Sequence, residues 1–482
     1  MKGIAEAVTG LERQLQQASE LAGATGMPGV GGYLAGIYHA GQQRVICAGY
    51  ANTAARIDMT QDTGFPLGSI TKAMTTTLVM RYVERGEIDL DGAVTAYLPD
   101  LTLQTPGHVD TLRVRHLLNH THGIDGTGLM PSAVRGRDAV KSYVDALAGC
   151  GTLFPVEQFV SYSNPGFSIA GRILEVVTGI PFTELLEREL YEPVGMADSA
   201  TSAEQAIMRR TAVGHTLDRR TGTIRPVDLF ALPPSGAAAG STAVVTIADL
   251  LAFARTHLAN GRSPSGRRVL SAEFSALMRT VTHDMQTPNI PPIGYGWWLL
   301  QFGSTVAMWH IGGTPGCTSH LIVLPDYDFA FAAFGSGPGA PLRHERHTLW
   351  LLRDYLGLEV PVTVTFDAAT SVDDAAKLAG YAGTYRTLQY RHDVRTVEGH
   401  LEHSVTFEPM DSDHARLGAY AGGPQPTKLA PVSNGIFAPA DRPAESFTGP
   451  FGRMNLVSFH GTTPDGHPSH VGRALALARR DT

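Results

Sequence analysis

Ser69 and Lys72 are the first residues of this chain whose types and spacing suggest chemistry. They lie three positions apart in the stretch Gly64–Leu78. The pattern predicts a helix that begins here and stops at Gly86, because the following turns carry apolar residues on one face: Leu78, Val79, Tyr82 and Val83. The serine and the lysine are therefore expected one turn apart on the same side of the helix start.

This pair has the makings of a nucleophilic centre. A serine hydroxyl becomes a good nucleophile only when a nearby base removes its proton. A lysine can act as that base once burial lowers its pKa to roughly 7 or 8. A helix start also carries unpaired backbone N–H groups, which favour any negative charge that develops beside them. A nucleophile, a base and part of an oxyanion site can thus arise within four residues.

A second segment, Ser161-Tyr162-Ser163-Asn164, precedes a predicted helix that runs from Pro165 through Val177. Such a loop can direct a phenol and an amide into a cleft. Tyr162 can share a proton with Ser69 and Lys72, and Asn164 can hold either a substrate carbonyl or the lysine. The alternative is a turn tyrosine that only caps the loop.

A third segment, Trp309–Gly313, is expected at a strand edge that runs into a glycine pair. Glycines let backbone N–H groups approach a ligand, and His310 can donate or accept a hydrogen bond above it. The loop His116–Gly123 also contains histidines, but neither a carboxylate nor a cysteine follows at metal-ligand spacing. We therefore expect a structural loop near the site there, and neither a metal nor a cofactor.

The composition limits the class of protein. The chain has 482 residues, 43% of them hydrophobic and 17% charged, which is typical of a soluble globular protein of two to four domains. A net charge of −7 without a basic run argues against nucleic-acid binding. The three cysteines form no disulfide framework. The start of the chain lacks a signal peptide's apolar core, and no 18-residue apolar run occurs, so we expect a cytoplasmic protein without a membrane segment.

The elements that would position these residues indicate an α+β fold. Helices are predicted at 3–22, 182–192, 247–258 with Thr246 as N-cap, 271–280 with Ser271 as N-cap, and 342–357. Strands are predicted at 32–39, 44–51, 295–302, 305–310, 318–324 and 329–334. Strands from both ends of this region would form one antiparallel sheet. The small-residue segment 232–242 is expected to be the wall or lid of a pocket.

The rest of the chain is predicted to be a second unit. Residues 1–357 would form the first domain and residues 358–374 a linker without a long apolar face. From Leu378 onward, short strands separated by Gly, Pro and Asp turns continue to the C-terminus. Residues 375–482 therefore suit a small antiparallel β-barrel.

In order, Ser69-x-x-Lys72, Tyr162-Ser163-Asn164 and His310-Ile311-Gly312 resemble the three motifs of the serine β-lactamase and penicillin-binding-protein clan, in the branch containing class C β-lactamases. The resemblance implies an antiparallel sheet covered by helices, with a helical lobe beside it and the site between them. It implies that Ser69 is acylated, that Lys72 is its base and that Tyr162 carries the proton. It also implies that Asn164 and His310 contact substrate and that the N–H groups of Ser69 and Gly313 form the oxyanion hole. The terminal barrel resembles the lipocalin-like domain of several clan members.

Within this clan, the chain looks most like the penicillin-binding-protein-type thioesterases, which are stand-alone cyclases of nonribosomal peptides. Three features carry that likeness: one catalytic domain with one terminal barrel and no leader, the spacing of Ser69, Tyr162 and His310, and the segment Gly449–Asn455. The resemblance implies a peptidyl carrier protein as partner and Arg453 as a barrel residue that faces the site. An ordinary exposed barrel arginine is the alternative for Arg453.

Two other functions stay open. A cytoplasmic D-stereospecific peptidase or an esterase would use the same residues to hydrolyse the acyl-enzyme, whereas a peptide-binding module would keep the fold without catalysis. The absence of an export signal argues against a peptidase or a β-lactamase that acts outside the membrane.

Overall fold

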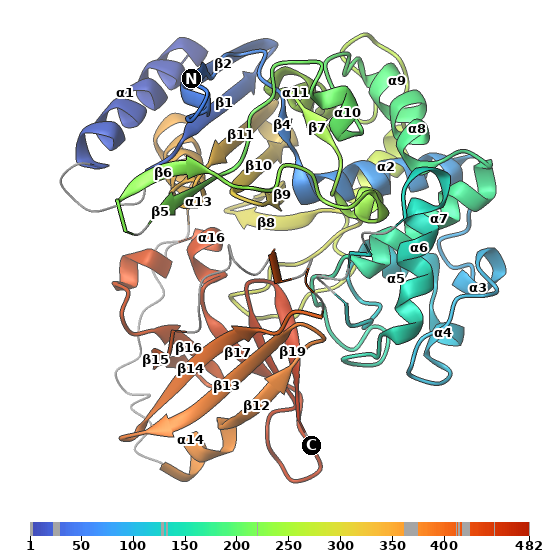
Figure 1. Ribbon diagram of the computed structural model, residues 1–482, viewed down its shortest axis with the longest axis vertical. Helices are drawn as coiled ribbons and strands as arrows, with labels where there is room; N and C mark the ends of the chain where they lie inside the picture. The colour runs from blue at the N-terminus through green and yellow to red at the C-terminus, as the bar shows by residue number, and fades with distance from the viewer. Residues whose placement is uncertain are drawn as a thin grey trace.

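The computed structural model describes residues 3–22, 29–126, 130–131, 134–218, 220–360, 375–410, 412, 415–416, 425–447 and 449–481. Its centre is a seven-stranded sheet in which every pair of neighbours is antiparallel (Figure 1). In spatial order the strands are β3 (Ile57–Asp58), β2 (Gln42–Asn52), β1 (Gly32–His39), β11 (Phe329–Ser336), β10 (Cys317–Leu324), β9 (Thr305–Thr314) and β8 (Trp298–Phe302). The pairing of β1 with β11 joins the two ends of this region, as the sequence predicted.

Helices cover both faces of the sheet, which explains why β1 and β11 are buried along their whole length. One face packs against α1 (Ile4–Ala22) and α13 (Ala340–Trp350), which a π-helical turn extends through Leu351–Tyr355. The other face packs against α11 (Ile247–Leu258). The termini of α11 and of α12 (Ala272–Met278) are set by Thr246 and Ser271, whose side chains accept from Asp249 N and Phe274 N, so both predicted N-caps are confirmed.

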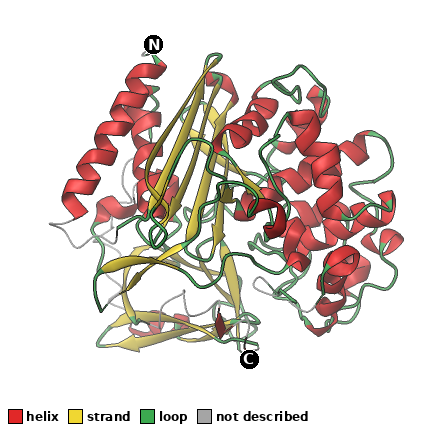
Figure 2. Cartoon of the chain, turned by 45° about the horizontal axis from the view of Figure 1, so that its top comes forward, coloured by secondary structure: helices red, strands yellow, loops and turns green. Residues whose placement is uncertain are grey.

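A helical lobe lies beside the sheet (Figure 2). The buried helix α2 (Thr71–Glu84) connects the lobe to the sheet. The other helices of this region are α3 (Val94–Tyr97), α4 (His108–Thr111), α5 (Val114–Leu118), α6 (Ala139–Ala146), α7 (Pro165–Thr178), α8 (Phe182–Leu186), α9 (Glu192–Val194) and α10 (Ala203–Ala206). Two short strand pairs lie outside the central sheet: β4 (Phe65–Pro66) with β7 (Val244–Val245), and β5 (His215–Asp218) with β6 (Thr223–Pro226).

The C-terminal region is a closed antiparallel barrel of eight strands. They are β12 (Gly383–Arg386), β13 (Tyr390–Val397), β14 (His400–Phe407), β15 (Thr427–Ser433), β16 (Ile436–Pro439), β17 (Val457–His460), β18 (His470–Arg473) and β19 (Ala476–Arg480). Apolar side chains such as Tyr385, Leu401 and Phe437 form a buried cluster there. Two helices accompany the strands, α14 (Ala375–Tyr381) and α16 (Gly449–Arg453).

The predicted fold class is confirmed, and several boundaries change. The strand predicted from 295 begins at Trp298, because Gly294 to Trp297 form the turn that enters it. Leu378–Tyr381 belong to α14 and not to a strand, and the barrel strands start at Gly383. The predicted helix 182–192 is interrupted by a π-helical turn at Glu187–Tyr191. Most of the predicted linker, 361–374, lies outside the described residues, so the domain boundaries stay a prediction.

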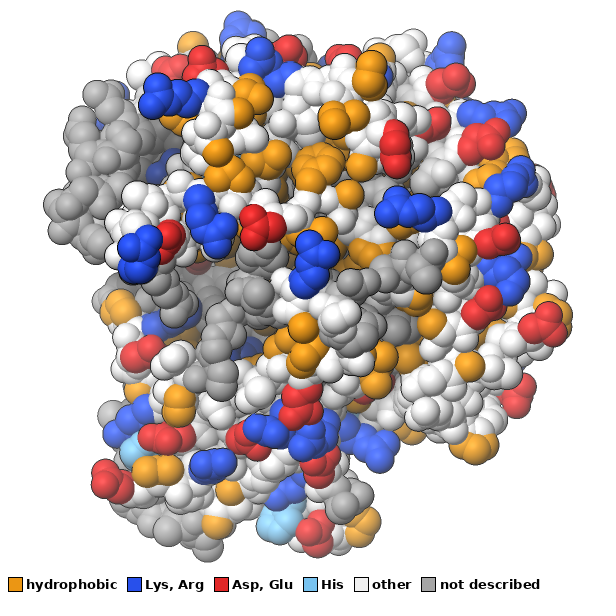
Figure 3. All heavy atoms as spheres, in the orientation of Figure 1, with side chains coloured by type: hydrophobic (Ala, Val, Ile, Leu, Met, Phe, Trp, Pro, Cys, Tyr) orange, Lys and Arg blue, Asp and Glu red, His pale blue; other side chains and the backbone are white. Residues whose placement is uncertain are grey.

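No helix in the described ranges is long and apolar enough to cross a membrane. On the face shown in Figure 3, acidic and basic side chains are interspersed.

Candidate active site

Ser69 does not lie inside the helix. It is the middle residue of a 3₁₀ turn, Gly68–Ile70, and α2 begins at Thr71. The turn is held by Thr71, whose hydroxyl donates to the Gly68 carbonyl at 2.8 Å. Ser69 is half-buried, whereas its neighbours Gly68 and Ile70 are buried. The hydroxyl is thus presented from a fixed backbone at the end of the sheet.

Lys72 lies one turn further on and is completely buried. Its Nζ donates to Ser69 Oγ at 3.1 Å, to Asn164 Oδ1 at 2.7 Å and to the Ala239 carbonyl at 2.8 Å. All three acceptors are neutral, so no negative charge among them offsets the cost of burying the ammonium form. Burial therefore lowers the pKa of Lys72 well below its usual value of 10.5. A neutral lysine has a free electron pair on its amine nitrogen, and with it the lysine can remove the Ser69 proton.

Tyr162 completes a cluster of three side chains. Its hydroxyl donates to Ser69 Oγ at 2.6 Å, and Lys72 Nζ lies 4.9 Å from the centre of its ring. Burial raises the pKa of Tyr162 above its ordinary value of 10.0, so the phenol keeps its proton. Ser69 Oγ thus stands between an amine and a phenol, the arrangement that proton transfer to and from an attacking hydroxyl requires.

Asn164 precedes α7, and the structure brings its side chain to Lys72 rather than to a helix cap. The Oδ1 atom accepts from the lysine, which fixes the direction of the Nζ group. Of the two roles that the sequence left open, the structure places Asn164 against the lysine. Its contact with substrate stays a prediction.

His310 is buried on β9, and its Nδ1 lies 2.7 Å from the Ile311 carbonyl. Because a carbonyl only accepts, Nδ1 carries the proton and Nε2 is left as an acceptor. Burial, followed by the positive charge of Lys72, lowers the pKa of His310 to about 3. The imidazole is therefore neutral over the usual working range of pH.

The backbone around Ser69 is crowded from two sides. A Cβ on Gly312 would lie 2.0 Å from the Leu67 carbonyl and 3.0 Å from Ser69 N, and a Cβ on Gly240 would lie 2.2 Å from the Gly68 carbonyl. Only glycine permits these approaches. Past the last pair with β8, Trp298 with Trp309, the end of β9 has an open outer edge. Ser69 and Gly313 both line the small pocket at this point. The assignment of their N–H groups to the oxyanion hole stays a prediction.

The Beta-lactamase family model matches residues 9–354, which is more than half of the chain. The chain belongs to the beta-lactamase family. It is 32% identical over 343 residues to penicillin-binding protein 4 of Amycolatopsis lactamdurans, covering 70% of this chain and 90% of that protein. It is also 29% identical over 283 residues to a D-aminopeptidase of Gluconobacter oxydans, covering 57% of this chain and 49% of that protein.

Solved structures share the fold. SurE, in a crystal structure with D-Leu, aligns with a TM-score of 0.71 at 22% identity and covers 99% of both chains. A D-amino acid amidase from Ochrobactrum anthropi, in complex with L-phenylalanine amide, aligns with a TM-score of 0.55 at 26% identity over 68% of this chain and 91% of that one. This beta-lactamase-family member is accordingly a serine hydrolase or acyltransferase.

The segment 232–242 does more than form a wall. Its 3₁₀ helix, Pro234–Ala239, supplies the carbonyl that accepts from Lys72 Nζ, and Ala238 O accepts from the Thr75 hydroxyl at 2.7 Å. No residue type in the segment indicates this backbone role, because any residue carries a carbonyl. Leu232 and Ser241 from the same segment line the small pocket in front of Ser69, together with Met130 and Tyr143.

His120 belongs to the loop His116–Gly123, which the sequence predicted as a structural loop near the site without singling out this residue. It is buried and has a φ of +59°, a left-handed conformation that costs energy in any residue with a Cβ, although histidine adopts it more often than most. The carbonyl of His120 accepts from Ser161 N at 3.0 Å, and its Nδ1 accepts from Ser163 N at 3.1 Å. The ring also lies 4.8 Å from that of Tyr162, centre to centre. His120 therefore clamps both neighbours of Tyr162. The role of His120 depends on its left-handed backbone, which cannot be predicted from the residue type.

Arg453 is the last residue of α16, on the barrel. Two residues earlier, Phe451 packs edge-on against Trp309 at 5.3 Å, so α16 is docked on the strand that carries His310. The Arg453 side chain is half-buried, and its Nε is buried without a hydrogen-bond partner among the described residues. Arg453 is thus not an ordinary exposed barrel arginine, but its contact with substrate stays a prediction.

Within the described residues, no cluster of metal-ligating side chains occurs.

Proposed function

We propose that this protein takes a peptidyl group from a carrier-bound thioester onto Ser69 and releases it by attack of the peptide's own N-terminal amine, which gives a macrolactam. The observation that carries the acylation half is the contact of Ser69 Oγ with both Lys72 Nζ and Tyr162 Oη, at 3.1 and 2.6 Å. Lys72 removes the hydroxyl proton as Ser69 attacks the thioester carbonyl. The resulting oxyanion lies against the N–H groups of Ser69 and Gly313, and its collapse breaks the C–S bond and releases the carrier thiol, which takes the proton from Lys72. When the peptide's amine then attacks the ester carbonyl, the C–O bond to Ser69 breaks and the serine regains its proton.

The barrel supports the second half of the proposal. Its β18–β19 turn is hydrogen-bonded directly to the loop that carries Tyr162: Tyr162 N donates to the Leu475 carbonyl at 2.8 Å, and Leu477 N donates to Ser161 Oγ at 2.9 Å. Leu475 and Leu477 also join the apolar cluster beneath the sheet. The barrel is therefore a fixed wall next to the nucleophile. The same two-part layout extends over the whole of SurE.

Ring closure competes with hydrolysis. Water is present at about 55 M, whereas a well-held amine on the same chain can reach an effective molarity of roughly 10⁵ M or more. The amine wins only if the peptide is folded back against the acyl-enzyme and water is kept away. A packed wall beside Tyr162 favours that outcome.

The test is a synthetic linear peptide with a free N-terminus and a C-terminal pantetheine thioester, analysed by mass spectrometry. We expect a cyclic product that is lost in Ser69→Ala. Free acid alone, across a set of peptides of different length and C-terminal chirality, would reject cyclisation while keeping the acyl-enzyme. A carrier protein loaded with the same peptide tests the proposed partner, because a faster reaction than that of free pantetheine requires protein contact.

A D-stereospecific peptidase or amidase is the second candidate. It is favoured by the similarity to a D-aminopeptidase and to a D-amino acid amidase. Hydrolysis of D-configured amino acid amides, with no turnover of the L-enantiomers and no cyclic product from thioesters, would establish it. A fluorophosphonate that fails to label Ser69 would instead favour a peptide-binding module.

A further inference from the structure

A second pocket opens beside the one that contains Ser69. Its volume is about 380 Å³, within the range of roughly 300–1,000 Å³ that small-molecule sites occupy. Leu232 and Ser241 line both pockets, so the two cavities adjoin at these residues. A group attached to Ser69 Oγ that extends past Leu232 and Ser241 would enter the larger pocket.

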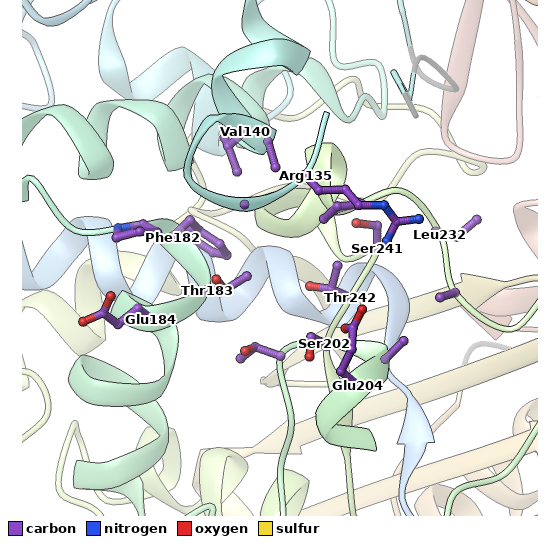
Figure 4. A pocket seen from close by; sticks show the side chains of 18 of the residues that line it. Arg135, Val140, Phe182, Thr183, Glu184, Ser202, Glu204, Leu232, Ser241 and Thr242 are labelled. Atoms are coloured by element: carbon purple, nitrogen blue, oxygen red, sulfur yellow. The ribbon is translucent and has the colours of Figure 1, made fainter. Parts of the chain in front are cut away.

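The walls of the larger pocket are chiefly apolar. Val140 and Phe182 are buried on the side of α6 and α8, and Val244 is buried on the side of β7. Phe230 adds a half-buried ring. In Figure 4, Phe182 and Thr183 lie on one side of the pocket, and Ser241 and Thr242 lie on the other. The space between them suits a large apolar side chain.

The charged groups of the pocket do not alter that preference. The buried carboxylate of Glu175 is already engaged, because it pairs with Arg172 at 2.9 Å and accepts from Phe182 N at 3.0 Å. These bonds fix the start of α8 and hence the ring of Phe182. The other charged residues that line the pocket are exposed: Arg135, Arg137, Glu184 and Glu204. Arg135 and Glu204 attract one another, and Glu184 pairs with Arg188. Exposed charges of this kind add little to affinity.

We propose that this pocket binds a large apolar side chain of the peptidyl group, from a residue upstream of the one whose carbonyl is attached to Ser69. The residue at the carbonyl itself occupies the smaller pocket, between Met130, Tyr143 and Leu232. The inference rests on the proposed function in one respect, which is that the acyl donor is a peptidyl thioester. It assigns to that function a substrate class, namely peptides with a bulky aliphatic or aromatic residue near the C-terminus.

The first experiment is a scan of peptidyl pantetheine thioesters in which each residue upstream of the C-terminal one is alternately alanine or leucine. Acylation is measured as release of the pantetheine thiol, which is the same whether the product is cyclic or linear. Rates are normalised to the Ser69 sites that a small fluorophosphonate titrates. We expect one upstream position where leucine raises kcat/KM at least tenfold over alanine. Equal rates at every position would overturn the proposal without affecting cyclisation.

The second experiment fills the pocket. In Thr183→Trp, the indole is expected to occupy the space opposite Thr242, so the leucine peptide should fall to the rate of the alanine peptide. Val176→Trp is the matched control, because Val176 is 45% exposed on the neighbouring helix α7 and lies outside the pocket. Its leucine-to-alanine ratio should equal that of the wild type.

A third variant covers the case in which Thr183→Trp does not fold. Phe230→Ala enlarges the pocket, and the preference at the same peptide position should shift from leucine toward tryptophan. A wild-type leucine-to-alanine ratio in Thr183→Trp, or an unchanged leucine-to-tryptophan preference in Phe230→Ala, would show that the side chain binds elsewhere.

Discussion

At the scale of single residues, the protonation state of Lys72 depends on the surroundings of its amine. The group is fully buried, and its acceptors are a hydroxyl, an amide and a carbonyl, none of which carries a negative charge. A carboxylate there would have kept the ammonium form. The fold instead favours the neutral amine, which is the form that a general base requires.

Removal of this amine tests its role directly. In Lys72→Ala we expect kcat/KM for acylation to fall by roughly 10²- to 10⁴-fold, the usual contribution of a positioned base. Thermal unfolding monitored by circular dichroism checks that the fold persists. Lys141→Ala is the matched control, since Lys141 is an exposed lysine paired with Asp145 on α6. A Lys72→Ala enzyme with near-normal rates would remove the lysine from the mechanism.

The pKa directions predict how rate depends on pH. The pKa of Lys72 is lowered by burial, so the amine becomes protonated, and acylation is lost, as the pH falls through that value. His310, with a pKa of about 3, is neutral between pH 5 and 9. It therefore adds no further pH dependence to the acylation rate in that range. In a pH–rate profile of kcat/KM, His310→Gln should therefore keep the acid limb of the wild type at the same pH. Displacement of that limb in the variant would mean that the histidine titrates with the reaction.

His120 is expected to act by positioning Tyr162. His120→Ala removes the Nδ1 acceptor of Ser163 N and should lower the acylation rate about tenfold or more, because the loop around Tyr162 loosens. His120→Asn keeps an acceptor at a similar place and suits a φ of +59°, so it should restore most of the rate. His120→Gly relieves the backbone strain without restoring the acceptor and should resemble the alanine variant in rate. If glycine rescues as well as asparagine, strain rather than the hydrogen bond is decisive.

At the scale of elements, the site is the meeting point of a 3₁₀ turn, a strand end and a small-residue segment. The end of β9 passes so close to Ser69 N that position 312 has no room for a side chain. The same strand holds His310 and, on its other face, Trp309, which packs against the barrel. Small displacements of β9 therefore change the oxyanion hole and the barrel contact together.

Gly312→Ala should damage the oxyanion hole without unfolding the protein. The new Cβ would meet the Leu67 carbonyl at 2.0 Å, so β9 must move away from Ser69 N. Loss of one aligned donor commonly costs roughly 10²- to 10³-fold in kcat. Ile311→Ala, an exposed neighbour on the same strand, should change kcat by less than about threefold. The comparison uses kcat for acylation from single-turnover kinetics, and equal values for the two variants would contradict this account.

At the scale of the whole molecule, the barrel contacts the loop that carries Tyr162. Its β18–β19 turn has two successive residues with positive φ, Ala474 at 49° and Leu475 at 74°, and the carbonyl of the second accepts from Tyr162 N. On another side, His470 Nε2 contacts the Leu153 carbonyl at 2.9 Å, and Asn289 Nδ2 donates to Ser458 Oγ at 2.8 Å. The barrel thus contacts loops of the helical lobe and the loop that precedes β8.

Loosening this contact should reduce catalysis from a distance. Phe451→Ala removes the ring that packs on Trp309, and such a loss costs about 3–5 kcal/mol when the site cannot collapse. We expect a several-fold lower acylation rate and a separate, earlier barrel transition in scanning calorimetry. Phe407→Ala, which removes a ring that packs at a tilt against Tyr390 within the barrel, should leave the acylation rate unchanged. A single wild-type transition and rate in Phe451→Ala would mean that the barrel is only attached.

The sequence by itself determined the fold class and the residue types of the site. Periodic apolar residues, cap residues and turn glycines are local signals, and they located α1, α11, α12 and most of the sheet. Three motifs then named Ser69, Lys72, Tyr162 and His310, because nucleophiles, bases and proton carriers need particular side chains.

Only the tertiary structure decided what depends on contacts between distant backbones. The carbonyl of Ala239 on Lys72, the left-handed backbone of His120 and the Leu475 carbonyl behind Tyr162 have no side-chain signature in the sequence. Ser69 lies in a 3₁₀ turn rather than in α2, because the convergence of β9 and the segment at Gly240 constrains that backbone. Residue types fix which reaction is chemically possible, whereas packing fixes the distances and the dehydration that give Lys72 its free amine.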